Sequence, residues 1–291
     1  MKLSFETPRQ AKAIKDGYLV LVPSGGLANR MMAIASAYAM TKQENCDLKV
    51  VWFQDWALEA PFHSIFTPPG EVRIDEAKGL DFLVYDRARR KNLWIPALPQ
   101  KMLFERRIRE TEIYKLKLKG FDFSAWMQGH KCYMSCHSLF GNVPDTLFRD
   151  LFHPVPEVMD VVSEYRSRFS THTIGLHIRR TDHVYAISNS PDELFIKKVE
   201  QEIEAHGDTT VFLATDNNQV KKTFADRFGK RIITPTEEAA RNSIDGIRGG
   251  LVDMYTLAAT DKIYGSAGST FSPMAASLGG NDLEILQREK V

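Results

Sequence analysis

A histidine and two arginines stand where an apolar run ends, in the sequence HIRRTD at residues 177–182. Guanidinium groups at the end of a buried strand are costly unless an anion or a carboxylate neutralises their charge. A diphosphate would serve, because Arg presents paired, planar donors that match phosphate oxygens. The segment therefore predicts a diphosphate site at Arg179 and Arg180, with Asp182 orienting one of the two. The alternative interpretation is a structural ion pair with Asp182 and no ligand.

Three other polar or glycine-rich segments follow predicted strands in the same way. They are SGGLANR at 24–30, TDN at 215–217 and GSAGSTFS at 265–272. Ligands of open α/β sheets bind outside the carboxyl ends of the strands. We therefore expect all four segments to line one ligand cleft.

Each of these segments offers its own chemistry, and each also has a simpler structural explanation. Gly25 and Gly26 let the backbone approach a ligand and open a helix whose N–H groups form an anion site, or they simply make a turn. Ser269 and Thr270 can donate to a phosphate, cap their own helix, or do both. Asp216 can accept hydrogen bonds from a ribose or a base edge, or cap the next helix.

The elements that must position these residues alternate between strand and helix. Residues 18–22, 27–42 and 48–53 predict a β-α-β opening, which is typical of a parallel sheet. The alternation resumes after a proline-rich stretch that ends at residue 156. The predicted strands there are 173–178, 209–214, 231–234 and 262–264, and the predicted helices are 192–205, 218–228, 250–260 and 269–278. The pattern predicts an α/β protein with two Rossmann-like domains, residues 1–155 and 156–291.

Composition excludes several classes of protein. With 291 residues, 43% of them hydrophobic and 26% charged, the chain is typical of a globular protein of about two domains. The near balance of 38 basic and 37 acidic residues argues against a nucleic-acid clamp. The longest nearly apolar stretch, residues 31–40, is shorter than the ~20 residues that a membrane-spanning helix needs. The first residues lack the apolar run of a secretory signal, so we expect a cytoplasmic protein.

The middle of the chain carries a local excess of positive charge, because residues 87–119 contain eleven Lys and Arg against three Glu. We interpret it as a solvated helix face with an edge strand at 114–119, since edge strands favour Lys. Contact with an acidic acceptor or peripheral contact with a membrane surface is the alternative. Further on, Cys132 and Cys136 match no common zinc spacing. We interpret them as ordinary thiols in a polar turn and predict no metal site.

Together these motifs resemble a known family. GGLANR at 25–30 resembles the G-G/R-L/F-G-N-Q/R element of the fucosyltransferases that use GDP-fucose, which are the α1,2, α1,6 and protein O-fucosyl groups. HIRRTD at 177–182 matches their H-x-R-R-x-D motif. FLATD at 212–216 and STFS at 269–272 are similar to their two later nucleotide-binding elements. The likeness spans most of residues 18–280 and leaves the middle of the chain unmatched.

The resemblance implies a bacterial-type glycosyltransferase of GT-B-like architecture, in which two Rossmann-like domains face a central cleft. It implies transfer of fucose from GDP-fucose to a glycan or glycolipid acceptor, with inversion at the anomeric carbon and with neither metal nor cofactor. A different donor such as GDP-mannose, and a catalytically silent protein that binds nucleotide sugars or glycans, are the alternatives. Departures from the family pattern at Ala28, Thr181 and His183 bear on the linkage and the acceptor. The general base would be Asp182 or His183.

The resemblance also implies roles for single residues. Arg180, helped by Arg179 and His177, would meet the negative charge that grows on the β-phosphate as the bond to the sugar breaks. Asn29 would face the donor from the N-terminal domain. The predicted catalytic residues are thus Asn29, His177, Arg180 and Asp182, and the predicted donor-binding residues are Gly25, Gly26, Arg179, Asp216, Ser269, Thr270, Phe271 and Ser272.

Overall fold

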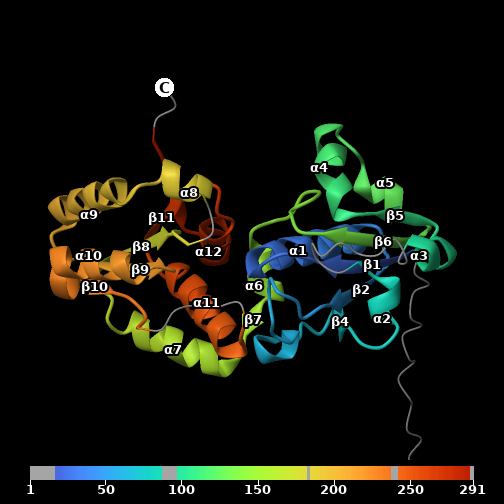
Figure 1. The fold of residues 1–291 in the computed structure, drawn as a ribbon, viewed down its shortest axis with the longest axis horizontal. Coiled ribbons are helices and arrows are strands. Elements are labelled where there is room, and N and C mark those ends of the chain that lie inside the picture. The colour runs from blue at the N-terminus through green and yellow to red at the C-terminus, as the bar shows by residue number, and fades with distance from the viewer. Residues whose placement is uncertain (1–16, 87–96, 182–183, 237–241, 289–291) are drawn as a thin grey trace, which may run out of the picture.

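Each half of the molecule is built on a parallel β-sheet (Figure 1). The computed structural model describes residues 17–86, 97–181, 184–236 and 242–288, and within these residues each of the two sheets has five strands. In Figure 1 the N-terminal half runs from blue to green, and the C-terminal half beside it runs from yellow-green to red. The α/β architecture with two parallel sheets confirms the prediction from the sequence.

The N-terminal sheet has the strand order β4–β2–β1–β6–β5, and all neighbouring strands pair in parallel. Strand β1 is central because its apolar run can be buried on both faces. Leu19 and Leu21 share a core cluster with helix α1, whereas Val20 and Val22 pack in a second cluster with Tyr133 and other rings. The elements are β1 (Tyr18–Pro23), α1 (Leu27–Gln43), β2 (Asp47–Trp52), β4 (Arg73–Glu76), α2 (Asp81–Val84), α3 (Ala97–Leu103), β5 (Arg106–Ile108), α4 (Glu110–Leu118), α5 (Phe123–Met127) and β6 (Lys131–Cys136).

The C-terminal sheet has the order β10–β9–β8–β11–β12 and is also parallel throughout. Counted along the chain its strands lie in the order 3-2-1-4-5, which is a doubly wound arrangement. The elements are α7 (Pro156–Arg166), β8 (His172–Ile178), α8 (Val184–Asn189), α9 (Asp192–His206), β9 (Thr209–Thr215), α10 (Asn218–Phe228), β10 (Ile232–Ile233), α11 (Ile244–Leu257), β11 (Lys262–Ser266), α12 (Phe271–Gly279) and β12 (Asp282–Leu286).

In both sheets the order of strands reverses beside the first strand, between β1 and β6 and between β8 and β11. The loops that leave such a pair turn to opposite sides, which opens a crevice at the carboxyl ends of the strands. At the first reversal the Ser24 amide donates to the Cys136 carbonyl at 2.8 Å, and at the second the Arg179 amide donates to Ser266 Oγ at 3.1 Å. The predicted site segments at 24–30, 177–182 and 265–272 therefore leave the sheets at both reversals.

The two halves are packed against each other through the middle of the chain. Strand β3 (Phe66–Thr67) pairs with β7 (His153–Pro154), which follows α6 (Thr146–Leu151) and immediately precedes α7. From helix α11 of the C-terminal half, the Tyr255 hydroxyl donates to the Phe152 carbonyl at 2.5 Å. Arg248, also on α11, donates from Nε to the Ser64 carbonyl at 2.8 Å. The expected domain boundary after residue 155 falls between β7 and α7 and stays a prediction.

Two predictions for the middle of the chain are wrong. The predicted edge strand at 114–119 belongs instead to helix α4, because Ile113 and Leu116, three residues apart, face the core while the Lys side chains face solvent. Cys132 and Cys136 lie in the buried strand β6 rather than in a polar turn. Burial raises the pKa of the Cys132 thiol to about 12 and that of Cys136 to about 11, so both stay protonated at neutral pH.

The basic segment at 87–119 is only partly described. Residues 87–96, with four of its basic side chains, lie outside the described residues. Arg106 and Arg107 belong to the edge strand β5, where their guanidinium groups donate to backbone carbonyls of Trp126 and Ala97. Among the described residues, no helix has the length and apolar character needed to span a membrane.

Arg30, in the first turns of α1, joins three segments of the N-terminal half. Its fully buried side chain donates from Nε to the Gly25 carbonyl at 2.9 Å and from Nη1 to the Phe53 carbonyl at 2.5 Å. Its Nη2 lies 3.0 Å from Asp55 Oδ2, and the guanidinium lies 4.6 Å from the centre of the Trp52 ring. This residue therefore fixes the loop after β1 to the loop after β2.

We expect Arg30→Ala to lower the free energy of unfolding by about 3–5 kcal/mol, because it leaves the largely buried Asp55 carboxylate without its partner. Chemical denaturation measures the loss. Arg73→Ala is the matched control, since Arg73 pairs with Asp75 at the surface, and it should change stability little. Equal losses in the two variants would contradict the structural role of Arg30.

Candidate functional site

The polar segments of the two halves meet at the carboxyl ends of their sheets. Thr270, just before α12, donates from Oγ1 to Asn29 Oδ1 at 3.0 Å, and Asn29 lies in the first turn of α1. These residues are 241 positions apart in the chain. The contact brings the glycine-rich turn of the N-terminal half next to the loop between β11 and α12.

The turn before α1 depends on its two glycines. Gly25 has a φ of +81°, and a Cβ added there would lie 2.9 Å from Asn29 Nδ2. Any larger residue would therefore be strained and would displace Asn29. Gly26 is the N-cap residue of α1, and no side chain caps the helix there. The first N–H groups of this 17-residue helix are thus directed toward the carboxyl ends of the sheet.

In the C-terminal half the Asp216 carboxylate organises the loop after β8. Its Oδ1 accepts the Arg180 amide at 2.8 Å, and its Oδ2 accepts the Thr181 hydroxyl at 2.6 Å. Burial raises the pKa of Asp216, but the hydrogen bond from Thr181 and the charge of Arg179 outweigh it, so that the pKa lies below its ordinary value. The cap of α10 is Asn217, whose side chain accepts the Val220 amide at 3.0 Å. Asp216 thus holds the loop rather than capping the helix.

Both arginines of this loop are paired with carboxylates. Arg179 Nη1 lies 2.8 Å from Asp216 Oδ2. Arg180 donates from Nε to Asp192 Oδ1 at 2.9 Å, and from Nη2 to the Ser190 carbonyl at 2.7 Å. Asp192 opens helix α9, so its position in the first turn is also favourable for a negative charge. The guanidinium planes are therefore fixed by neighbouring elements.

His177 is buried at the end of β8 and stacks on Phe271, with the ring centres 4.7 Å apart. Burial, together with the positive charge of Arg179, lowers the pKa of His177 to about 4. The ring is therefore neutral at neutral pH. Among the described residues Nδ1 has no hydrogen-bond partner. Its contribution to a ligand would be a hydrogen bond and a ring face rather than positive charge.

The turn before α12 supplies the remaining predicted residues. The Ser269 hydroxyl accepts the Phe271 amide at 3.3 Å, and Thr270 is the N-cap residue but its side chain bonds to Asn29 instead. Ser272 is fully buried, and a Cβ at Gly265 would lie 2.2 Å from Ser272 Oγ. Gly265 therefore lets α12 approach β11 closely.

The structure brings most of the residues predicted from the sequence into one region. Asp182 and His183 lie outside the described residues, so the ion pair expected with Asp182 stays a prediction. Among the described residues, the carboxylates of Asp216 and Asp192 pair with Arg179 and Arg180. Sequence reasoning missed Asp192, although an acidic residue at the start of a predicted helix after the arginines was a visible signal.

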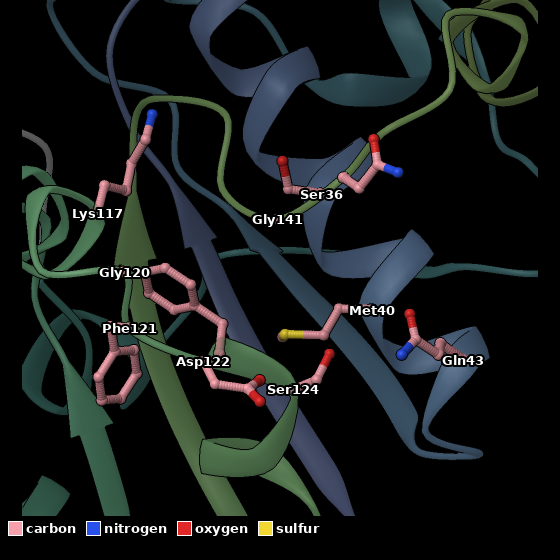
Figure 2. A pocket seen from close by; sticks show the side chains of 11 residues that line it. Ser36, Met40, Gln43, Lys117, Gly120, Phe121, Asp122, Ser124 and Gly141 are labelled. Atoms are coloured by element: carbon pink, nitrogen blue, oxygen red, sulfur yellow. The ribbon is translucent and has the colours of Figure 1, made fainter.

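A separate pocket of about 320 Å³ lies on the N-terminal half (Figure 2). Figure 2 shows Met40 and Gln43 of α1 on one side of it and Lys117, Asp122 and Ser124 on the other. A helix rises about 1.5 Å per residue, so Met40 lies roughly 16 Å along α1 from Asn29. None of the residues that line this pocket belongs to the predicted donor site.

Two parallel sheets whose facing carboxyl ends carry the polar residues define a GT-B-like architecture of two Rossmann-like halves. No protein-family model matches the sequence, and no curated protein is significantly similar to it. Among solved structures, the chain is similar to the α-1,6-fucosyltransferase NodZ soaked with GDP-fucose, with a TM-score of 0.62 and 19% identity over 91% of this chain and 93% of that one. NodZ from Bradyrhizobium gives a TM-score of 0.63 at 17% identity, over 90% and 93% of the two chains.

Two other fucosyltransferases have a similar structure. A point mutant of Arabidopsis thaliana FUT1 in complex with GDP has a TM-score of 0.60 and 17% identity, over 97% of this chain and 72% of that one. POFUT1 in complex with GDP has a TM-score of 0.57 and 11% identity, over 94% and 99% of the two chains. The chain therefore has the fold of these fucosyltransferases, as the resemblance of its motifs predicted.

The depressed pKa of His177 predicts a specific loss of stability in acid. The unfolded chain takes up a proton at an ordinary histidine pKa of about 6.5, whereas the folded protein does so only near pH 4, so stability falls as pH falls from 6.5 to 4. The contribution is about 3 kcal/mol over this window. In His177→Gln this loss should be absent, which denaturant unfolding at several pH values would show.

Wild-type protein also contains Asp253, and burial raises the pKa of its carboxyl group to about 7. The contribution of Asp253 to stability therefore changes with pH in the opposite direction. The readout is therefore the difference between wild type and variant, in which the Asp253 contribution cancels. His153→Gln, at an exposed position, is the matched control and should leave the slope unchanged. A His177→Gln protein with the acid dependence of wild type would show that His177 is not the titrating group.

Proposed function

We propose that this protein is an inverting, metal-independent glycosyltransferase that transfers fucose from GDP-fucose to a glycan or glycolipid acceptor in the cytoplasm. The observation that carries the proposal is the contact between Asn29 and Thr270, at the carboxyl ends of both sheets. It joins the uncapped N-terminus of α1 to the α12 turn, and Phe271 joins that turn to His177 in the arginine segment. Of the proteins with this fold, the fucosyltransferase NodZ was soaked with GDP-fucose, and POFUT1 was solved in complex with GDP.

The donor diphosphate would lie over the Arg179–Arg180 loop and the N-terminus of α12. Both features favour anions, because a helix N-terminus presents unpaired N–H groups and a positive dipole end. Arg180 carries five N–H donors, and its contacts with Asp192, Ser190 and the Arg179 carbonyl use four of them among the described residues. An N–H on Nη1 is left for a phosphate oxygen. Pairing with Asp192 would therefore orient the guanidinium and still permit phosphate contact.

The chemical step follows from this placement. As the bond between the sugar and the β-phosphate breaks, negative charge grows on the phosphate, where fixed donors stabilise it more than they stabilise the ground state. Arg180 and the α12 N-terminus would supply those donors. Neutral His177 would add a hydrogen bond and hold Phe271 in place. The general base would be Asp182 or His183.

Donor hydrolysis tests the proposal directly. Purified protein is incubated with GDP-fucose, GDP-mannose, and the UDP, ADP and CDP sugars in the presence of EDTA, and release of the nucleoside diphosphate is measured. GDP release from GDP-fucose, undiminished by EDTA, is the expected result. Release from GDP-mannose alone would identify GDP-mannose as the donor. Activity that returns only with Mn²⁺ or Mg²⁺ would overturn metal independence. Binding of GDP-fucose without turnover in the presence of acceptor glycans would identify a silent binding protein.

We expect Arg180→Ala to lower turnover with GDP-fucose by at least about 100-fold while the protein stays folded, because the side chain serves the leaving group. Arg180→Lys should rescue little, since Lys keeps the charge but loses the planar, paired donors. Steady-state kinetics and circular dichroism measure both properties. Arg227→Ala, at an exposed arginine of α10 paired with Glu200, is the matched control. Near-normal turnover of the Lys variant would argue against bidentate phosphate contact.

Substitution of Asp216 should mainly affect GDP binding, whereas substitution of Asn29 should mainly affect turnover. Asp216→Ala should weaken GDP binding by about tenfold or more, because the loop that carries the arginines loses its anchor. Asn29→Ala should lower kcat with GDP affinity near that of wild type, since its contact with Thr270 matters in the closed, reacting complex. Calorimetric titration of GDP and steady-state kinetics measure the two effects.

Asp226→Ala, at an exposed carboxylate paired with Lys222 on α10, is the control for loss of a negative charge in the same half. It should leave both GDP affinity and kcat unchanged. If Asn29→Ala loses GDP affinity as severely as Asp216→Ala does, the proposed division between the two halves is wrong.

A further inference from the structure

We propose that His172, Glu202 and His206 form a binding site for a borderline divalent metal ion such as Zn²⁺, at the end of the C-terminal sheet opposite to the donor site. One ligand atom from each of the three side chains lies within 4.8 Å of the other two. Imidazole nitrogen and carboxylate oxygen are the donors that zinc accepts beside thiolates. Three protein ligands leave a fourth position for water.

The local structure brings these donors to one point. His172 begins β8, whereas Glu202 and His206 lie one turn apart on α9 and so share a face of that helix. His172 Nε2 lies 2.8 Å from Glu202 Oε2, and His206 Nε2 lies 3.7 Å from the same oxygen. Ligand atoms of a tetrahedral zinc ion with bonds of about 2.0–2.1 Å are roughly 3.3 Å apart. The two observed distances bracket this value.

The side chains around the cluster suit a bound cation. The Glu202 carboxylate accepts a hydrogen bond from the Tyr264 hydroxyl and lies 2.8 Å from His172 Nε2, so neighbouring side chains hold it in place. The Asp261 carboxylate lies 4.0 Å from His172 Nδ1, on the side of the ring away from Glu202. At this distance Asp261 makes no hydrogen bond to the ring, but it adds a second negative charge beside the cluster.

The two imidazole rings stack with their centres 3.8 Å apart and an angle of 28° between their planes. Convergence on one ion requires the His206 ring to turn out of this stack. Its side chain is 48% exposed, so it can do so without moving the core. His172 and Glu202 are more buried, with 21% and 14% of their side chains exposed, and would provide the fixed part of the site.

The consequence is structural rather than catalytic. His172 and Ile178 are the two ends of β8, and a strand rises about 3.3 Å per residue, so the site lies about 20 Å from the arginine loop. A metal there would join α9 to the start of the central strand and stabilise the folded state by binding to it alone. The site is thus compatible with transfer that continues in EDTA.

Calorimetry with zinc itself tests this inference without any activity assay. Chelator-treated, dialysed protein is titrated with ZnCl₂, and thermal unfolding is followed with and without excess Zn²⁺. Wild type is expected to bind one equivalent and to gain thermal stability, and His206→Gln is expected to bind at least tenfold more weakly with no gain. His63→Gln is the matched control, because His63 is 67% exposed and lies in the other half of the molecule. MgCl₂ should give neither heat nor stabilisation, since Mg²⁺ prefers oxygen ligands.

Three results would overturn the inference. They are equal zinc binding by wild type and His206→Gln, binding without a rise in thermal stability, and an equal response to Mg²⁺. The melting temperature of the zinc-free variant, expected to match that of wild type, shows that a loss of binding is not a loss of fold. Because no donor or acceptor is used, failure of this test leaves the proposed transferase activity untouched.

Discussion

The carboxylate of Asp216 is the constraint on which the C-terminal part of the site depends. Strands β8 and β9 are parallel neighbours, so their carboxyl ends meet, and a carboxylate at the end of one can hold the loop that leaves the other. Asp216 accepts the Arg180 amide and the Thr181 hydroxyl and pairs with Arg179. These contacts hold the backbone at Arg180 and direct the Arg179 guanidinium, while Asp192 directs the Arg180 guanidinium. Donors fixed in this way need little reorganisation when charge develops on a substrate.

The N-terminal half contributes through position more than through charge. Arg30 is buried and fixes the backbone around Gly25, and that turn places Asn29 against Thr270 of the other half. The contact between Asn29 and Thr270 would form and break if the two halves moved relative to each other. A residue with this geometry can report closure of the two halves around a donor, which is how lids and domains assemble many catalytic sites. The site is therefore divided between a rigid anchor and a contact between halves.

The sequence predicted the outer parts of the chain well and its middle poorly. Apolar runs that end in glycine or charged residues located β1 and β8 because a strand buried on both faces leaves little freedom in composition. The predictions for the middle of the chain failed because local sequence patterns there are misleading. Alternation at 114–119 imitates a strand, while the core contacts follow helical spacing. Cys132 and Cys136, expected in a polar turn, lie in the buried strand β6. The partners of Arg179 and Arg180 could not be predicted, because tertiary packing alone brings Asp216 and Asp192 to them.

A crystal structure of the protein with GDP would show directly whether the arginine loop binds the diphosphate. We expect the diphosphate to lie within hydrogen-bond distance of the Arg179–Arg180 loop and of the first N–H groups of α12, with Asp216 still bonded to the loop. A diphosphate bound elsewhere, for example in the pocket beside Met40 and Gln43, would contradict it. So would a complex in which neither guanidinium contacts a phosphate oxygen.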